Sequence, residues 1–200
     1  MFYDAIKKNH GLPHDPFKAI VTPRPIGWIS TQDAKGRHNL APYSFFNALC
    51  DRPPIVMFSS DGMKDSASNA QETGVFACNL ATYALKDAMN ASSAPLEHGV
   101  SEFERAGLTP VPCDLIDAPR IKEAAVVMEC ETLEVKPLVD RSGQEASYTM
   151  VIGQVVGIHI DDSCLVDGLL DTALLKPIAR LGYRDYAVVD AVFQLTRPDS

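Results

Sequence analysis

Residues 24–69 constrain the fold of this chain more than any other segment. They begin with a run of β-branched and aromatic residues, 26–31, which a polar turn containing Gly36 joins to a second run, 39–47. Two such runs joined by a glycine-containing turn predict a β-hairpin. The second run mixes aromatic rings with hydroxyl and amide groups instead of alternating cleanly, so we expect its strand to contact a ligand as well as cover a core.

The composition fits one domain without metals or disulfides. The chain has 200 residues, 46% of them hydrophobic, and a chain of this size buries about 70% of its unfolded surface. A formal net charge of −8 disfavours binding to a phosphate backbone, so nucleic acid is not an expected partner. No apolar run is long enough to span a membrane and no signal-peptide core begins the sequence, so we expect a cytoplasmic protein with no membrane partner.

The cysteines and histidines do not indicate a metal site. The cysteines are five in number and widely spaced, so we expect buried free thiols: Cys50, Cys78, Cys113, Cys130 and Cys164. His10 and His14 have a spacing found in zinc sites, but Gly11 and Pro13 would break the helix that places such residues on one face. We therefore expect no bound metal.

The chain reads as a short N-terminal arm followed by one mainly β domain. Residues 1–18 predict a short helix and then an extended arm, and the domain covers residues 19–200. We expect strands at about residues 19–31, 38–48, 54–60, 75–81, 124–139, 147–160 and 186–195. Short helices at 65–73 and 83–90 lie between strands without βαβ alternation, which favours an antiparallel barrel of six or seven strands with peripheral helices.

Two features of the later sequence stand out. Gly153 and Gly157 fall inside a predicted strand, where isolated glycines indicate bulges or a sharp bend. Residues 91–122 are proline-rich and mostly irregular, with one or two helical turns, and are a candidate lid or dimer contact.

A phosphate site is predicted where the helix at residues 65–73 begins. We expect Asp65 to be the N-cap residue, and a helix start offers free N–H groups and a positive dipole end to an anion. The polar residues grouped here are Ser59, Ser60, Lys64, Asp65, Ser66 and Asn69. The alternative is an ordinary capped helix beside a solvated lysine.

The aromatic run at residues 43–47 is a second candidate ligand site. Strand alternation would send Tyr43, Phe45 and Asn47 to one face and Ser44 and Phe46 to the other. The alternative is that some of these rings only fill the barrel.

Four single residues have both a structural and a functional interpretation. Trp28 fits a core position better than a stacking one. Arg24 and Arg180 could meet a phosphate or a dinucleotide, or form surface charges. His159 could donate a proton, but its place before two carboxylates in a strand fits a hydrogen-bonded structural histidine.

Absent motifs narrow the function. The sequence contains no Gly-x-Gly-x-x-Gly, no P-loop motif and no Gly-x-Ser-x-Gly, which disfavours a Rossmann domain, a P-loop enzyme and an α/β-hydrolase. No acid–base pair stands out either, so we assign no catalytic residue.

An ordered series of short motifs resembles the flavin reductase-like proteins, the FMN-binding split-barrel group. The series runs from about residue 19 to the C-terminus and comprises Pro23–Trp28, Asn39–Ala48, Pro53–Pro54, Lys64–Ser66, Ser101–Glu104, His159–Asp162 and Arg180–Tyr183. The resemblance implies an FMN-binding split β-barrel, with the FMN phosphate at the Lys-Asp-Ser element and the pyrimidine edge of the flavin along the backbone of residues 39–48. The cofactor-binding residues it implies, together with those grouped above, are Asn39, Pro42, Tyr43, Ser44, Phe45, Ser59, Lys64, Asp65, Ser66, Asn69 and Arg180.

The resemblance also implies a function. It suggests a homodimeric oxidoreductase in which NADH or NADPH, binding transiently, reduces FMN, and the flavin then reduces a small-molecule or protein electron acceptor. The cofactor supplies the chemistry and the protein supplies its position. Two alternatives remain open: a non-catalytic flavin-binding electron carrier that a redox partner reduces, and an oxidase of a pyridoxamine-like substrate.

Overall fold

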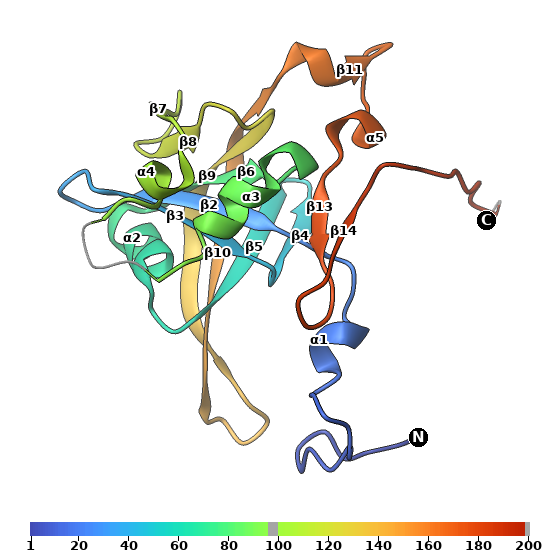
Figure 1. Cartoon of the computed structure of the whole chain (residues 1–200). Coiled ribbons are helices and arrows are strands. Elements are labelled where there is room, and N and C mark those ends of the chain that lie inside the picture. Colours follow the sequence, from blue (N-terminus) through green and yellow to red (C-terminus); the bar gives the residue numbers. More distant parts are fainter. Residues whose placement is uncertain (96–99, 199–200) are drawn as a thin grey trace.

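The computed structural model describes residues 1–95 and 100–198, and its centre is one seven-stranded sheet (Figure 1). Neighbouring strands are antiparallel throughout and follow the order β3-β2-β6-β9-β10-β5-β4. The strands are β2 (Gly27–Gln32), β3 (His38–Tyr43), β4 (Phe46–Asp51), β5 (Pro54–Asp61), β6 (Val75–Leu80), β9 (Val126–Val139) and β10 (Glu145–Ile160). The predicted mainly β fold with antiparallel strands is confirmed.

The sheet closes on itself because its two edge strands are consecutive in the chain. Only Ser44 and Phe45 separate β3 from β4, although these strands stand at opposite ends of the strand order. Tyr43 pairs with Gly27 of β2, whereas Phe46 pairs with Phe58 of β5. Edges joined by so short a connection must lie near each other, which makes the sheet a barrel.

Short helices and small sheets surround this barrel (Figure 1). Two of these sheets are hairpins, and the third pairs residues near both ends of the chain. The helical elements are α1 (Phe17–Ile20), α2 (Asp65–Thr73), η1 (Tyr83–Leu85), α3 (Lys86–Ala91), α4 (Glu102–Ala106), η2 (Asp162–Cys164) and α5 (Thr172–Leu175). The minor strands are β1 (Arg24–Pro25), β13 (Ile178–Arg180) and β14 (Tyr186–Val188) in one sheet, β7 (Pro110–Pro112) with β8 (Pro119–Ile121), and β11 (Leu165–Val166) with β12 (Leu169–Leu170).

The barrel interior is filled by large side chains, and the predicted strand glycines make room for them. Phe58 and Phe76 are fully buried in the main core. A Cβ at Gly153 would lie 2.5 Å from the ring of Phe76. The β9–β10 register shifts next to Gly153 and next to Gly157, which confirms the predicted bulges.

Some predicted boundaries were wrong. Residues 19–23 are not strand, because α1 ends at Ile20 and the chain enters the sheet only at β1. The single strand predicted at 38–48 is two strands, because the chain changes partner at Ser44–Phe45.

Both ends of the chain also differ from the prediction. The helix of the arm lies at its end, in α1, rather than at its beginning, because Pro16 is its N-cap residue. The last strand stops at Val188, beyond which Phe193 and Leu195 are each 85% exposed. Part of the predicted lid, residues 96–99, lies outside the described residues. In the part of the chain that the structure describes, every helix is too short or too polar to cross a bilayer.

Candidate functional site

Six of the eleven residues predicted to hold a cofactor line a cavity of about 450 Å³, which we call the cradle pocket. The end of β3 forms one wall, the start of α2 a second, and the segment after α3 a third. Its lining includes Asn39, Pro42, Tyr43, Lys64, Asp65, Ser66, Ser92, Ser93 and Glu102. The hairpin and the helix start predicted from residues 24–69 therefore meet at one place.

In the part of the chain that the structure describes, the start of α2 has no side-chain cap. Its N-cap residue is Lys64 rather than the predicted Asp65, which is the first helical residue. Lysine cannot accept a hydrogen bond, and over residues 1–95 and 100–198 no side chain caps the helix. The N–H groups of the first turn and the exposed Lys64 thus converge on the cradle pocket, as an anion site requires.

A buried amide network fixes α2 to the β2–β3 hairpin. The Asn39 amide donates to Thr31 Oγ1 at 3.1 Å and to Ser66 Oγ at 2.8 Å, and the Asn69 amide donates to Thr31 Oγ1 at 3.1 Å. All four side chains are buried. Asn39, Ser66 and Asn69 therefore position the helix start, while Lys64 and the backbone face the cavity.

Tyr43 connects this network with the barrel core. Its ring lies 4.8 Å from that of Phe58 between centroids. Burial raises the pKa of Tyr43, and the nearby hydroxyls of Ser66 and Ser60 oppose that rise only in part. The Tyr43 side chain is therefore an uncharged phenol at neutral pH, and it forms part of the wall of the cradle pocket.

Five predicted cofactor residues do not line the cradle pocket: Ser44, Phe45, Ser59, Asn69 and Arg180. Ser59 is buried on β5, and its Oγ has no hydrogen-bond partner among the described residues. Phe45 faces Tyr148, with ring centroids 5.5 Å apart. Arg180 lines a second cavity of about 560 Å³, together with Ser44.

We call this second cavity the basic pocket because Lys18, Arg24, Arg180 and Arg184 line it. It adjoins the cradle pocket, since Pro42 and Ser93 line both. The sequence drew attention to Arg24 and Arg180 but not to Lys18 or Arg184. Nothing local marks those two, because the pocket joins α1 to the turn after β13.

The alternation expected for residues 43–47 was wrong. Tyr43 and Phe46 were assigned to opposite faces, yet both pack against the same core cluster. The change of partner strand at Ser44 and Phe45 interrupts the two-residue period.

Trp28 is a core residue, as predicted. It is fully buried, and its Nε1 donates to Ser92 Oγ at 2.9 Å. Ser92 in turn donates to the carbonyl of Met89 at 2.8 Å. Trp28 thereby holds the segment that forms the third wall of the cradle pocket.

Glu102 adds a carboxylate to the cradle pocket that the sequence analysis missed. Its Oε2 accepts the N–H of Leu40 at 3.1 Å, which joins α4 to the outer edge of β3. Burial is the main cause that raises the pKa of Glu102, and the charge of Asp65 raises it further. Only the Ser101–Glu104 motif had pointed to this turn.

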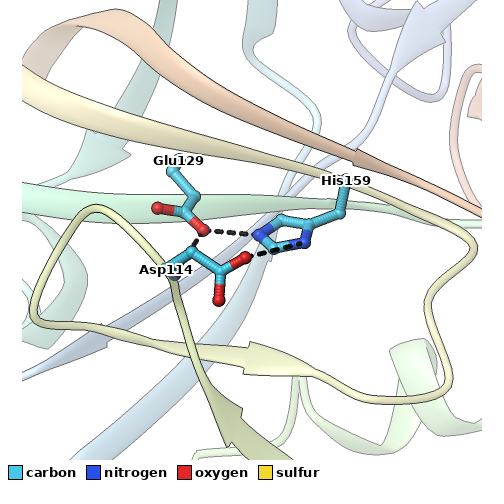
Figure 2. A group of neighbouring side chains, drawn as sticks. All are labelled: Asp114, Glu129 and His159. Atoms are coloured by element: carbon cyan, nitrogen blue, oxygen red, sulfur yellow. Dashed lines mark hydrogen bonds and ion pairs between the residues drawn. The ribbon is translucent and has the colours of Figure 1, made fainter.

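Figure 2 shows His159 with two carboxylates, Glu129 and Asp114. Glu129 is fully buried, and its two oxygens accept the N–H groups of Asp114 at 2.8 Å and Leu115 at 2.7 Å. His159 Nε2 lies 2.5 Å from Glu129 Oε1, and Nδ1 lies 4.0 Å from Asp114 Oδ2.

The hydrogen bonds of Glu129 with the segment after β7 and with His159 join that segment to strands β9 and β10. Burial acts to raise the pKa of Glu129, but the amides of Asp114 and Leu115 and the His159 ring outweigh it and hold that pKa low. The three side chains are close enough for a metal ion, yet both Glu129 oxygens already accept hydrogen bonds. His159 is hydrogen-bonded, as predicted, whereas Glu129 was missed because a lone acid in a strand gives no signal.

The cysteines are free, as predicted, but not all are buried. Cys50 is exposed on β4, against the prediction, because β4 is an edge strand. Burial raises the pKa of Cys78 to about 12. His10 and His14 contact aromatic rings of Tyr3 and Tyr183.

Comparison with known proteins agrees with this geometry. A family model described as the flavin reductase like domain matches residues 20–173. An uncharacterized protein of Halalkalibacterium halodurans is 37% identical over 183 residues, which cover 89% of this chain and 87% of that protein.

Solved structures give the same result. Nitrilotriacetate monooxygenase component B from Bacillus cereus superposes with a TM-score of 0.86 and 29% identity, over 98% of this chain and 99% of that chain. A protein of Shewanella frigidimarina described as a flavin reductase with a split barrel domain superposes with a TM-score of 0.85 and 23% identity, over 99% of this chain and 100% of that chain. The predicted split barrel is therefore confirmed.

Proposed function

The chain belongs to the flavin reductase-like family, and from this premise we propose that it is an FMN-dependent oxidoreductase. It would take reducing equivalents from NADH or NADPH and pass them to a small-molecule or protein acceptor. A monooxygenase partner is one candidate acceptor, because the Bacillus cereus neighbour is described as a monooxygenase component.

The uncapped start of α2 beside the end of β3 carries this proposal. FMN combines a phosphate with a planar ring that is apolar on its faces and polar at one edge. Lys64 and the first-turn amides of α2 suit the phosphate, and Tyr43 and Pro42 supply a flat wall beside it. The residues present therefore fit FMN.

The outer edge of β3 can supply the polar contacts. Leu40 N–H points away from β2, since it meets Glu102. Residues two apart on a strand point their backbone groups the same way, so the Pro42 carbonyl shares that edge of β3. Because proline has no backbone N–H, Pro42 leaves no unpaired donor at the outer edge of β3.

When bound, FMN would supply two-electron redox chemistry, and the protein would supply position and exclusion of water. Asn39 and Asn69 keep the helix start in place, and Trp28 keeps the segment after α3 against the cavity. No described side chain needs to exchange a proton for this role.

We also propose that the protein acts as a homodimer. Both ends of the chain leave large apolar side chains in solvent, including Phe2, which is 95% exposed, and Phe193, which is 85% exposed. Such side chains are commonly buried at a subunit interface. Light scattering of the FMN-loaded protein at micromolar concentration should give a dimer mass, and a monomer mass would contradict this proposal.

Two measurements test the proposed function. Calorimetric titration should show tight FMN binding, and a protein that binds no FMN would overturn the proposal. Anaerobic mixing of the loaded protein with NADH, and separately with NADPH, should then bleach the flavin absorbance. If neither donor bleaches it while dithionite does, the electron-carrier alternative replaces the reductase.

A further inference from the structure

The basic pocket concentrates positive charge in an acidic protein. Of the described residues, four cationic side chains and no Asp or Glu line it, although the chain has a formal net charge of −8. Over residues 1–95 and 100–198, no ion pair joins any of the four to a carboxylate. Their charge is therefore not neutralised within the described chain.

Two of these cations face each other directly. Arg24 and Arg180 are cross-strand partners in the pairing of β1 with β13. Like charges at directly opposed positions of a sheet destabilise it. Burial, and then the charge of Arg180, lower the pKa of Arg24, which is only 5% exposed.

Backbone groups hold both guanidinium groups in place without removing their charge. Arg24 donates to the carbonyls of Lys18, Val21 and Leu181, the last at 2.8 Å. Its buried Nε has no partner among the described residues.

The other cations of the pocket are held more loosely. Arg180 donates to the Tyr183 carbonyl and lies 4.4 Å from the ring centroid of Tyr186. Lys18 and Arg184 are exposed. Arg24 thus donates to three carbonyls and Arg180 to one, whereas the Lys18 and Arg184 side chains reach solvent.

We propose that the basic pocket binds the phosphate or carboxylate group of a small molecule whose remaining part reaches into the adjoining cradle pocket. Guanidinium groups in a fixed arrangement are suited to both oxyanions. Pro42 and Ser93 line both cavities, so one molecule can enter both. The extension of this molecule into the cradle pocket rests on the proposed flavin site, whereas anion binding in the basic pocket does not.

The test uses full-length protein, with and without FMN, and two probes, inorganic pyrophosphate and benzoate. Calorimetry should show that at least one probe binds. The double change Arg180→Gln, Arg184→Gln should weaken that probe at least tenfold. Loss of pyrophosphate binding identifies a phosphate site, and loss of benzoate binding identifies a carboxylate site.

Two further variants keep the test informative. Arg184→Gln alone changes an exposed side chain, so it should fold normally and still weaken the probe severalfold. Arg141→Gln changes an exposed arginine in the β9–β10 turn, away from the pocket, and should leave the affinity within twofold.

The inference is overturned if neither probe binds, or if the probes bind equally to wild type and double variant. It is also overturned if the double variant weakens FMN but not riboflavin, since the pocket would then hold the flavin phosphate. If FMN does not bind but the probes respond to the arginine changes, the anion subsite is supported and the proposed function fails.

Discussion

The cradle pocket and the basic pocket are neighbouring cavities that differ in the charges of the side chains lining them. The cradle pocket opposes one exposed lysine, Lys64, with two carboxylates, Asp65 and Glu102, and depends on a buried amide network. Among the residues that the structure describes, the basic pocket has four cations and no carboxylate. Recognition in the first should depend on hydrogen-bond geometry, and in the second on charge.

The largest expected effect tests whether the cradle pocket holds a phosphate. The double change Lys64→Ala, Ser66→Ala should weaken FMN about 100-fold, because loss of one charge-assisted hydrogen bond from Lys64 costs about 1.5–3 kcal/mol and loss of the Ser66 hydroxyl weakens the network that positions the helix start. Riboflavin lacks the phosphate and should weaken less than about threefold on the same reasoning. Fluorescence titration of both flavins measures the difference.

Single changes serve as controls for that double variant. Lys64→Ala alone leaves the buried Ser66 in its network, so it separates loss of a contact from loss of structure. Lys35→Ala removes an exposed lysine from the β2–β3 turn and should not alter either affinity. Equal losses of FMN and riboflavin in the double variant would place the phosphate elsewhere.

The second prediction distinguishes a basic-pocket residue that stabilises the fold, Arg24, from one that is expected to contribute to binding only, Arg184. Arg24→Met removes donors to three carbonyls, so the free energy of unfolding should fall by about 2–4 kcal/mol. Arg184→Gln should change it by less than about 0.5 kcal/mol, as surface substitutions usually do. Urea denaturation measures both, and equal stabilities would show that Arg24 does not anchor β1.

The smallest effect concerns the acid in the cradle pocket. At pH 7 Glu102→Gln keeps an acceptor for Leu40 but removes a negative charge, and FMN should bind about threefold tighter, the scale of an exposed charge pair. Glu104→Gln, an exposed acid on the same helix, is the matched control. Unchanged or weaker FMN binding in Glu102→Gln alone would contradict this prediction.

The sign of the accompanying pH effect follows from the raised pKa of Glu102. The native state holds this proton more tightly than the unfolded chain does, so ionisation lowers stability as pH rises through the raised value. Below the ordinary carboxyl pKa of about 4.3, the native and unfolded side chains are both protonated. Glu102→Gln should therefore be more stable than wild type at pH 7, and this advantage should shrink near pH 4.

Sequence signals from neighbouring residues predicted the elements that form the cradle pocket. The features that the sequence analysis missed depend on pairing between residues far apart in the chain. The turn at Gly36 and the helix ending before Gly74 follow from backbone preferences of nearby residues, and both were found. The partner change at Ser44 depends on closure of the whole barrel. The pairing of Arg24 with Arg180 depends on how the end of the chain returns to its beginning.

That pairing has a consequence for the order of events during synthesis. The residues of the amide network lie between Thr31 and Asn69 and leave the ribosome close together. Arg24 and Leu181, which close the basic pocket, are 157 positions apart in the chain. A nascent chain can therefore complete the amide network early, but the basic pocket exists only after residues 180–184 have been made. An anion bound there would selectively stabilise molecules in which residues 180–184 have already packed against Lys18 and Arg24.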